Sequence, residues 1–363
     1  MHKLVDLRSD TVTQPTAAMR ACMASAEVGD DVFGDDPSVN ELQDKLADLL
    51  GFDAALFVPT GTQSNLCALM AHCQRGDEYL VGQMAHTYRW EGGGAAVLGS
   101  IQPQPLNHQS DGSLALDDIE AAIKPDDAHY ARTRLLTLEN TFGGKLLPFD
   151  YVEAATSLAA HHGLGRHLDG ARLFNAAVAQ ARLLSGGAAD APALDYSDIV
   201  AQARRIAGCF DSVSVCLSKG LGAPVGSVLC GSRELIARAH RVRKMVGGGM
   251  RQAGVLAAAG IYALDHHITR LVDDHDLATR LVAGLHGLPD VVIESAQTNM
   301  VFVDLQGQAR SRASALIAHL KEQGVLCTGL YRLRLVTHLD VDVAGVDRAV
   351  AAFWSFFDGR QSA

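Results

Sequence analysis

A lysine and an aspartate each stand at the end of a short apolar run that is typical of a buried strand. Lys219 follows the run 211–217 after one serine, and Asp169 directly follows the run 165–168. Desolvation of an amine at such a position favours its neutral form, so Lys219 could form an imine with an aldehyde. Asp169 could keep a proton on a ring nitrogen. The structural alternatives are an ammonium group that reaches solvent and an ion pair between Asp169 and Arg172.

A possible phosphate site lies earlier in the chain. Thr60, Gly61 and Thr62 follow the apolar run 54–58 and start an expected helix that extends to about Cys73. Backbone N–H groups at a helix start bind anions, and the two hydroxyl groups would add donors. An ordinary helix cap is the alternative. An amine, an acid and a phosphate site in one sheet are together what pyridoxal phosphate requires.

The elements that must position these groups alternate between short apolar runs and amphipathic helices. This order predicts an α/β fold with a mostly parallel sheet and helices on both faces, and ligands of such sheets bind at the carboxyl ends of the strands. The run 226–230 follows 211–217 too soon for a crossover helix, so we expect these two strands to be antiparallel. Asp36 and Pro37 predict the start of a helix that ends at Gly51.

The composition changes near residue 250, where a long helical region rich in Ala and Leu begins. We therefore expect three parts. An N-terminal segment, 1–30, would pack on the C-terminal domain or on a neighbouring subunit. A large cofactor-binding domain would cover 31–250, and a smaller α+β domain would cover 251–363.

Composition and charge exclude several classes of protein. The net charge of −10 argues against a nucleic-acid surface. No run approaches the roughly 18 consecutive apolar residues of a membrane span, and the first residues lack the pattern of a secretory signal. The seven cysteines form no C-x-x-C pair, which is typical of reduced thiols. We expect a cytoplasmic enzyme without a metal site, since zinc, dinucleotide and Walker motifs are missing from the sequence.

Seven segments carry a resemblance to a known family, the low-specificity L-threonine and L-allo-threonine aldolases, over about residues 4–340. These segments are 6–13, 28–34, 59–65, 167–175, 216–226, 247–252 and 334–338. The resemblance implies fold type I of the pyridoxal-phosphate enzymes and reversible cleavage of β-hydroxy-α-amino acids to glycine and an aldehyde. It also implies a homotetramer, a dimer of dimers with active sites at subunit interfaces. One departure is Phe142, where the family commonly has histidine.

The resemblance also implies which residues hold the cofactor. Lys219 would form the imine, and Asp169 would bind the protonated ring nitrogen. The phosphate group would bind at the helix start and to a basic residue of a neighbouring subunit. The implied cofactor residues are Thr60, Gly61, Thr62, His86, Asp169, Arg172 and Lys219, joined by Lys244 or Arg251.

The implied substrate site contains Ser9, Arg172 and Arg334 around the carboxylate. His129 would face the β-hydroxyl group and influence the choice of diastereomer, while His86 would stack on the cofactor ring. The base could be His86, His129 or a water held by either of them. Another fold-type I enzyme, a β-eliminating lyase or an aminotransferase, is the nearest alternative. A more distant one is a non-enzymatic α/β protein in which Lys219 is structural.

Overall fold

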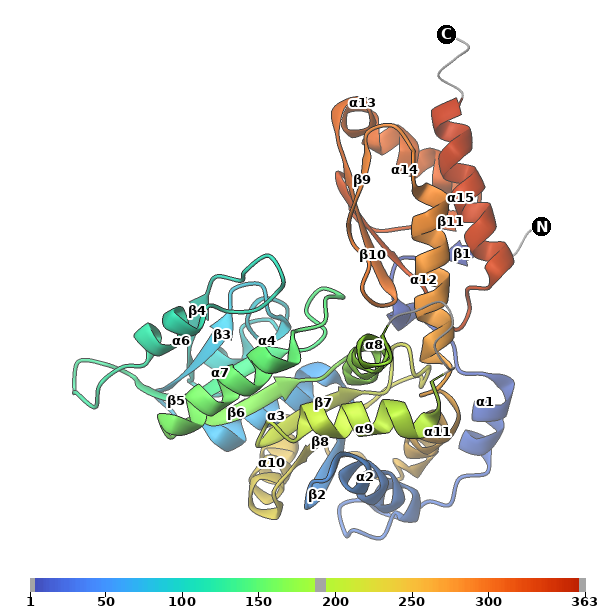
Figure 1. Cartoon of the computed structure of the whole chain (residues 1–363). Coiled ribbons are helices and arrows are strands. Elements are labelled where there is room, and N and C mark those ends of the chain that lie inside the picture. The colour runs from blue at the N-terminus through green and yellow to red at the C-terminus, as the bar shows by residue number, and fades with distance from the viewer. Residues whose placement is uncertain (1–3, 187–193, 359–363) are drawn as a thin grey trace. The chain divides into compact units, whose positions relative to one another are not determined.

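The computed structural model describes residues 4–186 and 194–358, and the chain divides into two compact units (Figure 1). Unit 1 contains residues 1–14, 143–145 and 269–363, and unit 2 contains residues 15–142 and 146–268. The change of unit thus comes at residue 269 and not at the expected 250. The reason is helix α11 (Gly254–His266), which packs against α1 (Ala17–Ala24) and α2 (Pro37–Leu50) of unit 2.

Unit 2 is built on a seven-stranded sheet in the order β2-β8-β7-β6-β5-β3-β4. Strand β8 is antiparallel to both of its neighbours, and all other pairs are parallel. The mostly parallel sheet and the antiparallel pair of β7 and β8 were predicted from the sequence, whereas the antiparallel pair of β2 and β8 was not. The strands are β2 (Ala54–Val58), β3 (Asp77–Gly82), β4 (Gln102–Leu106), β5 (Arg132–Glu139), β6 (Gly165–Asp169), β7 (Ser212–Cys216) and β8 (Ser227–Gly231).

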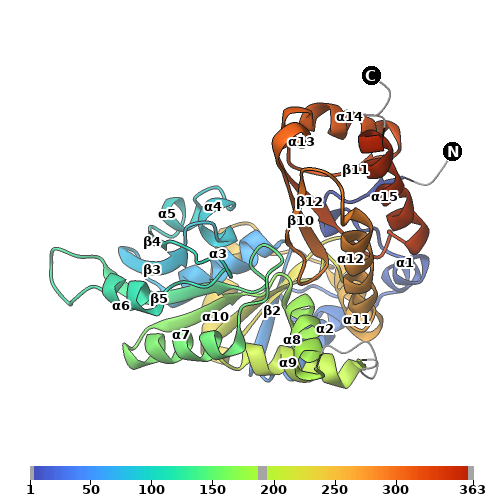
Figure 2. The same cartoon turned by 45° about the horizontal axis from the view of Figure 1, so that its top comes forward.

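Helices cover both faces of this sheet. Helix α3 (Gly61–His72) packs against α10 (Arg233–Met245) and against strands of the sheet. Helices α7 (Phe149–His161) and α9 (Tyr196–Ala207) lie on the side of the sheet away from α3 (Figure 2). The remaining helices of unit 2 are α4 (His86–Arg89), α5 (Gly94–Val97), α6 (Leu116–Ala122) and α8 (Leu173–Leu184). The α/β fold class is therefore confirmed.

Local signals explain where helix α2 begins and ends. The Asp36 carboxylate accepts a hydrogen bond from the Val39 N–H at 3.0 Å, and Pro37 takes the first helical position. Gly51 ends the helix with a φ of 82°, in the left-handed region that glycine adopts without strain. The sequence predicted all three features.

Unit 1 has a smaller core of its own. Strands β12 (Arg332–Val336), β10 (Met300–Leu305) and β9 (Val291–Ser295) form an antiparallel sheet, and β1 (Val5–Asp6) pairs in parallel with β11 (Val325–Leu326). Buried side chains such as Val303, Leu316 and Phe353 fill the space between the sheet and the helices. These helices are η1 (Asp10–Val12), α12 (Leu271–Leu285), α13 (Gly307–Ser311), α14 (Ala313–Glu322) and α15 (Val343–Asp358). In the described part of the chain, no helix is both long and apolar enough to cross a membrane.

Candidate active site

The carboxyl ends of β5, β6 and β7 bring the polar groups of unit 2 together. Glu139 is the last residue of β5 and lies directly beside Asp169, the last residue of β6. Asp169 in turn pairs with Ser214 of β7, two residues before that strand ends. The loop that carries Lys219 follows, and its ammonium charge is close enough to lower the pKa of Glu139. The strand ends therefore place an amine and two carboxyl groups at one edge of the sheet.

The loop that carries Lys219 connects two fully buried strands, β7 and β8. Its ends are held by two hydrogen bonds, from Leu217 N–H to the Gly226 carbonyl and from Ala223 N–H to the Leu217 carbonyl, both at 3.0 Å. The Gly222 N–H donates to the carbonyl of Lys219 at 2.8 Å. The Lys219 side chain itself is only partly buried. The backbone of the lysine is thus fixed while its amine can reach a ligand.

The start of helix α3 approaches the end of β7 very closely. A Cβ atom added to Gly61 would lie 2.6 Å from the Cys216 Sγ, so only glycine fits without a shift of one element. The Thr60 hydroxyl caps the helix by accepting a hydrogen bond from Gln63 N–H at 3.1 Å. The N–H groups of Gly61 and Thr62 belong to the first turn, where no helical carbonyl pairs with them. These groups can therefore bind an anion at the edge that carries Lys219.

Asp169 is 3% exposed and accepts two hydrogen bonds. One comes from the Ala171 N–H at 3.0 Å, and the other comes from the Asn65 side-chain amide at 2.9 Å. The same Asn65 amide also donates to Glu91 at 2.8 Å. A buried carboxylate with spare acceptor capacity at a strand end can bind a protonated ring nitrogen.

His86 lies among three carboxyl groups. Its Nδ1 is 2.8 Å from a Glu91 oxygen, and its backbone N–H donates to Glu139 at 2.8 Å. The hydrogen bond to Glu91 raises the pKa of His86, with further increases from the charges of Asp169 and Glu139. Burial beside Asp169 raises the pKa of Glu139 to about 7, and burial also raises the pKa of Glu91. The ring of His86 therefore binds a proton more strongly than a free imidazole does, and its other nitrogen, Nε2, is the one not bound to Glu91.

The ligand atoms of His86, Glu91 and Asp169 lie within 4.8 Å of one another, a spacing that could surround a metal ion. The Asn65 amide, however, already donates to an oxygen of each carboxylate. A donor hydrogen in this position competes with a cation for the same oxygens. We therefore assign these residues to a hydrogen-bond network and not to a metal site.

The expected substrate residues Ser9 and Arg334 belong to unit 1, in which both lie beside Arg8. Arg334 donates from Nη2 to the carbonyl of Arg8 at 3.0 Å. The Ser9 hydroxyl oxygen accepts hydrogen bonds from the backbone and the hydroxyl of Thr11, at 3.2 and 2.9 Å. Arg172 belongs to unit 2 and immediately precedes α8. Its charge lowers the otherwise raised pKa of Cys216, which places Arg172 near the end of β7.

His129 lies on the loop before β5, and its side chain is 88% exposed. Its Nδ1 is 2.6 Å from an Asp127 oxygen. Strand β5 starts at Arg132 and continues for eight residues to Glu139, which separates its two ends by roughly 23 Å. The structure therefore does not bring His129 to the site that contains His86 in the same chain.

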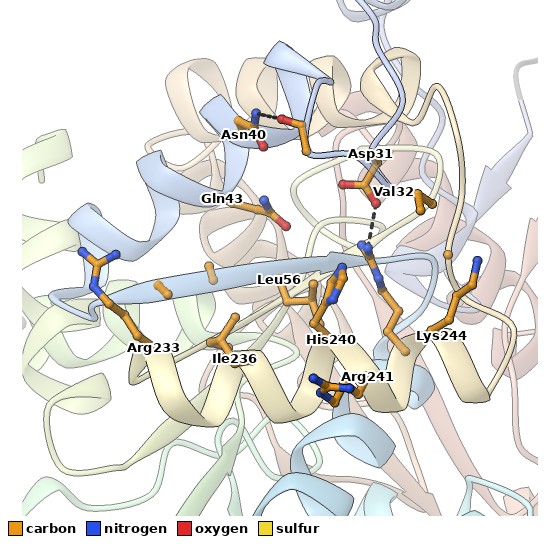
Figure 3. A pocket seen from close by; sticks show the side chains of 16 residues that line it. Asp31, Val32, Asn40, Gln43, Leu56, Arg233, Ile236, His240, Arg241 and Lys244 are labelled. Atoms are coloured by element: carbon orange, nitrogen blue, oxygen red, sulfur yellow. Dashed lines mark hydrogen bonds and ion pairs between the residues drawn. The ribbon is translucent and has the colours of Figure 1, made fainter.

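The expected phosphate ligands Lys244 and Arg251 lie at and after the end of α10. The loop between them contacts the first turn of α3, where the Gln63 side-chain amide donates to the Val246 carbonyl at 3.5 Å. Lys244 lines a cavity of about 770 Å³ between α2, β2 and α10, together with His240 and Arg241 (Figure 3). Arg243 and Asp31 form a buried ion pair at 2.7 Å, and a dashed line marks it at the labelled Asp31 in Figure 3. Arg251 forms a 3.0 Å ion pair with Asp30.

Comparison with known proteins supplies the family. Residues 6–308 match the family of beta-eliminating lyases. Over 357 residues the chain is 50% identical to the low specificity L-threonine aldolase of Escherichia coli K12, and the alignment covers 98% of this chain and 100% of that relative. The chain belongs to the family of beta-eliminating lyases. Its expected assignment to the low-specificity L-threonine aldolases is confirmed.

Solved structures support the same fold. A putative L-allo-threonine aldolase from Listeria monocytogenes EGD-E matches with a TM-score of 0.77 at 19% identity, covering 97% of this chain and 96% of that one. A structure of SPT with pyridoxal phosphate matches with a TM-score of 0.72 at 17% identity, covering 99% and 88%. The chain is a pyridoxal-phosphate-dependent carbon–carbon lyase of fold type I, as the resemblance implied.

The residues of unit 2 fit this cofactor. The first-turn N–H groups at the start of α3 offer donors to a phosphate group, and Asp169 offers an acceptor to a ring nitrogen. Within residues 4–186 and 194–358, the buried side-chain nitrogen of Asn140 has no hydrogen-bond partner, and Asn140 directly follows Glu139. An unpartnered buried donor in the residue that follows β5 is consistent with a polar ligand near this edge of the sheet.

Three polar residues of this region were not assigned a role from the sequence: Asn65, Glu91 and His108. His108 stacks on Phe142 with ring centroids 3.8 Å apart and planes 15° apart, and burial lowers its pKa to about 4. Phe142, which occupies the position where the family commonly has histidine, therefore packs against the neutral imidazole of His108. Asn65 ends the segment 59–65 that carries the family resemblance, but neither Asn65 nor Glu91 could be assigned a role from the sequence, because their partners come from segments far apart in the chain.

Proposed function

We propose that this aldolase cleaves L-threonine and L-allo-threonine reversibly to glycine and acetaldehyde, and that it accepts related β-hydroxy-α-amino acids. The observation that carries the proposal is the 50% identity, over nearly the whole of both chains, to an L-threonine aldolase. The position of Lys219, Asp169 and His86 around one strand edge supports it.

We propose that Lys219 holds the cofactor through an imine and that Asp169 accepts the proton of the ring nitrogen. The first-turn N–H groups of Gly61 and Thr62 would bind the phosphate group, and His86 would face the ring. When bound, pyridoxal phosphate supplies an electron sink for the pair released at Cα. Arg172 and Arg334 would bind the substrate carboxylate, which orients the bond to be broken.

His86 is the base that the geometry favours. In the tautomer whose Nδ1–H donates to Glu91, Nε2 keeps a lone pair that can take the proton of the β-hydroxyl group, directly or through a water. The O–H electron pair then forms the aldehyde C=O bond as the Cα–Cβ bond breaks. A proton delivered to Cα completes glycine, so atoms and charge balance.

The test is release of acetaldehyde from L-threonine by the holoenzyme without any oxo-acid, measured with a coupled alcohol dehydrogenase. We expect acetaldehyde and glycine in equal amounts. Turnover that requires an oxo-acid would indicate an aminotransferase, and release of ammonia with an oxo-acid would indicate a β-eliminating lyase. Either outcome, with the cofactor fully loaded, would refute the proposal.

We further propose a homotetramer, a dimer of dimers, in which His129 acts in the site of a neighbouring subunit. The roughly 23 Å between the ends of β5 supports this, because it keeps His129 away from His86 of its own chain. Mixing Lys219→Ala and His129→Ala subunits tests the arrangement. Hybrids regain a site with both wild-type residues only if His129 acts between subunits, so the wild-type preference between diastereomers should return. Failure to regain it, with hybrids verified by mass, would refute the arrangement.

We also propose a cytoplasmic location. The seven cysteines are all free thiols, which is typical of proteins from reducing compartments. Cell fractionation with an antibody to the chain would test this proposal.

A further inference from the structure

A continuous chain of hydrogen bonds extends from His86 into the centre of unit 2. Asn65, on helix α3, is 2% exposed and is the point at which this chain branches. Its side-chain nitrogen is 2.8 Å from a Glu91 oxygen and 2.9 Å from an Asp169 oxygen. Because an ionised carboxylate only accepts hydrogen bonds, the NH₂ group must face both acids and must give one hydrogen to each.

The hydrogen-bond directions on the other side of the Asn65 amide are also determined. Its Oδ1 lies 3.2 Å from His167 Nε2, so that nitrogen must carry the hydrogen. Burial lowers the pKa of His167 to about 3, so the ring is neutral and its Nδ1 is an acceptor. The Ser212 hydroxyl, 2.8 Å away, must donate to this Nδ1. His72 Nε2, at 2.7 Å from the same hydroxyl, must then donate to Ser212.

Every donor in this chain therefore points toward the two carboxylates. The order is His72, Ser212, His167 and Asn65, and it ends on Asp169 and Glu91. A rotation of the Asn65 amide by 180° would place its oxygen against two acids and its NH₂ group against a donor. The network thus permits one orientation of Asn65.

We propose that Asn65 is a positioning residue of the reaction, because its one amide holds the acid of the cofactor ring and the acid that orients His86 in a shared geometry. The proposal rests on the proposed roles of Asp169 and His86. The negative charges of Asp169 and Glu91 repel each other, and the hydrogen bonds from the shared NH₂ group of Asn65 stabilise both carboxylates. Without it, Asp169 and Glu91 lose a donor together, and both the cofactor and the ring of His86 become less well ordered.

Asn65→Asp is the most informative substitution, since it keeps the shape and removes both donor hydrogens. The dissociation constant of the cofactor, measured by fluorescence titration of the apoprotein, should rise about tenfold to a hundredfold at pH 8, as expected when a buried charged group loses a hydrogen bond. The ratio of the variant's constant to that of the wild type should fall as the pH is lowered. The reason is that the introduced carboxyl group, once it is protonated, regains one donor.

Two controls separate positioning from a loss of packing. Asn65→Ala should raise the dissociation constant of the cofactor by a factor, relative to wild type, that does not change with pH. Ser64→Ala removes a neighbouring, fully buried hydroxyl of the same helix, whose partner is Ser214 and not an acid. Ser64→Ala should leave the dissociation constant of the cofactor within about twofold of the wild-type value. A pH-independent ratio for Asn65→Asp, or wild-type affinity in both Asn65 variants, would overturn the proposal.

Glu91→Gln keeps the proposal testable if the Asn65 variants do not fold. The charged and titratable groups that face His86 are Glu91, Glu139 and Asp169, with Lys219 beside Glu139. Loss of the Glu91 charge should move the acidic limb of the pH profile of kcat/KM to lower pH, and an unchanged limb would overturn the proposal. Cofactor affinity is measured without substrate. If the wild type released no acetaldehyde while the affinity data agreed, the proposed function would fail and the role of Asn65 would stand.

Discussion

Gly61→Ala tests whether the start of helix α3 is held against the end of β7. The added Cβ would lie 2.6 Å from the Cys216 Sγ, whereas ordinary contacts between heavy atoms lie at about 3.5–4.0 Å. One element must therefore move by about 1 Å. Gly61 is not among the glycines with positive φ, so alanine causes no backbone strain and the effect is due to space alone.

The cost of this overpacking should be about 1–3 kcal/mol in the free energy of unfolding. In a unit of this size, that corresponds to a fall in Tm of roughly 2–10 °C. A shift of the first helical turn also displaces the N–H groups of Gly61 and Thr62. The dissociation constant of the cofactor should therefore rise about tenfold, because each 1.4 kcal/mol of binding free energy is worth that factor.

The assay is thermal unfolding of the apo and holo forms, together with cofactor titration. Cys216→Ala should relieve the clash, so the double variant should show a favourable coupling of about 1–2 kcal/mol. Gly94→Ala is the matched control, since it also places alanine at the first position of a helix but meets only Leu66, at 3.7 Å. A Gly61→Ala protein as stable as the wild type, or a double variant without coupling, would refute the packing argument.

Three further predictions concern single side chains. Lys219→Ala should lower turnover by at least about 10³-fold while the Tm of the apoprotein stays within about 2 °C, because the side chain is only partly buried; residual wild-type activity would contradict the imine. Glu139→Gln should stabilise the apoprotein by up to about 3 kcal/mol relative to wild type at pH 8. The folded pKa of about 7 exceeds the ordinary 4.5, so the wild type loses stability as the pH rises between these values and the variant does not; equal pH dependence in chemical denaturation would count against this. His129→Ala should change the ratio of rates for L-threonine and L-allo-threonine more than it changes cofactor affinity, and equal losses on both isomers would argue against its assigned role.

The buried strands were predictable because continuous apolar runs such as Ala54–Val58 have few other uses. Strand β4 (Gln102–Leu106) was not, since it contains Pro103 and Pro105. Proline cannot donate to a ladder, yet β4 lies at the edge of the sheet and pairs only with β3, which leaves the other side of the strand unpaired. Its position in the fold, which the sequence does not state, makes the prolines acceptable.

The same distinction applies to the site. The positions of Lys219 and Asp169 at strand ends were predictable because a strand end is a local pattern. Asn65 and Glu91 were not, because the function of each depends on which segment lies opposite. Asn65 meets Asp169 across 104 positions of sequence and meets Glu91 across 26. Side-chain amides and carboxylates are common on helices and loops, and only tertiary packing distinguishes these two.

The loop between β7 and β8 has a consequence for repeated turnover. The hydrogen bonds that close this loop connect two strands that are buried along their whole length. The main chain at Lys219 is therefore held in place by the strands on either side of it. If Lys219 holds the cofactor as proposed, its released amine could move aside only by rotation about the bonds of its own side chain. Return of the amine to the cofactor after product release would then need no reorganisation of the fold.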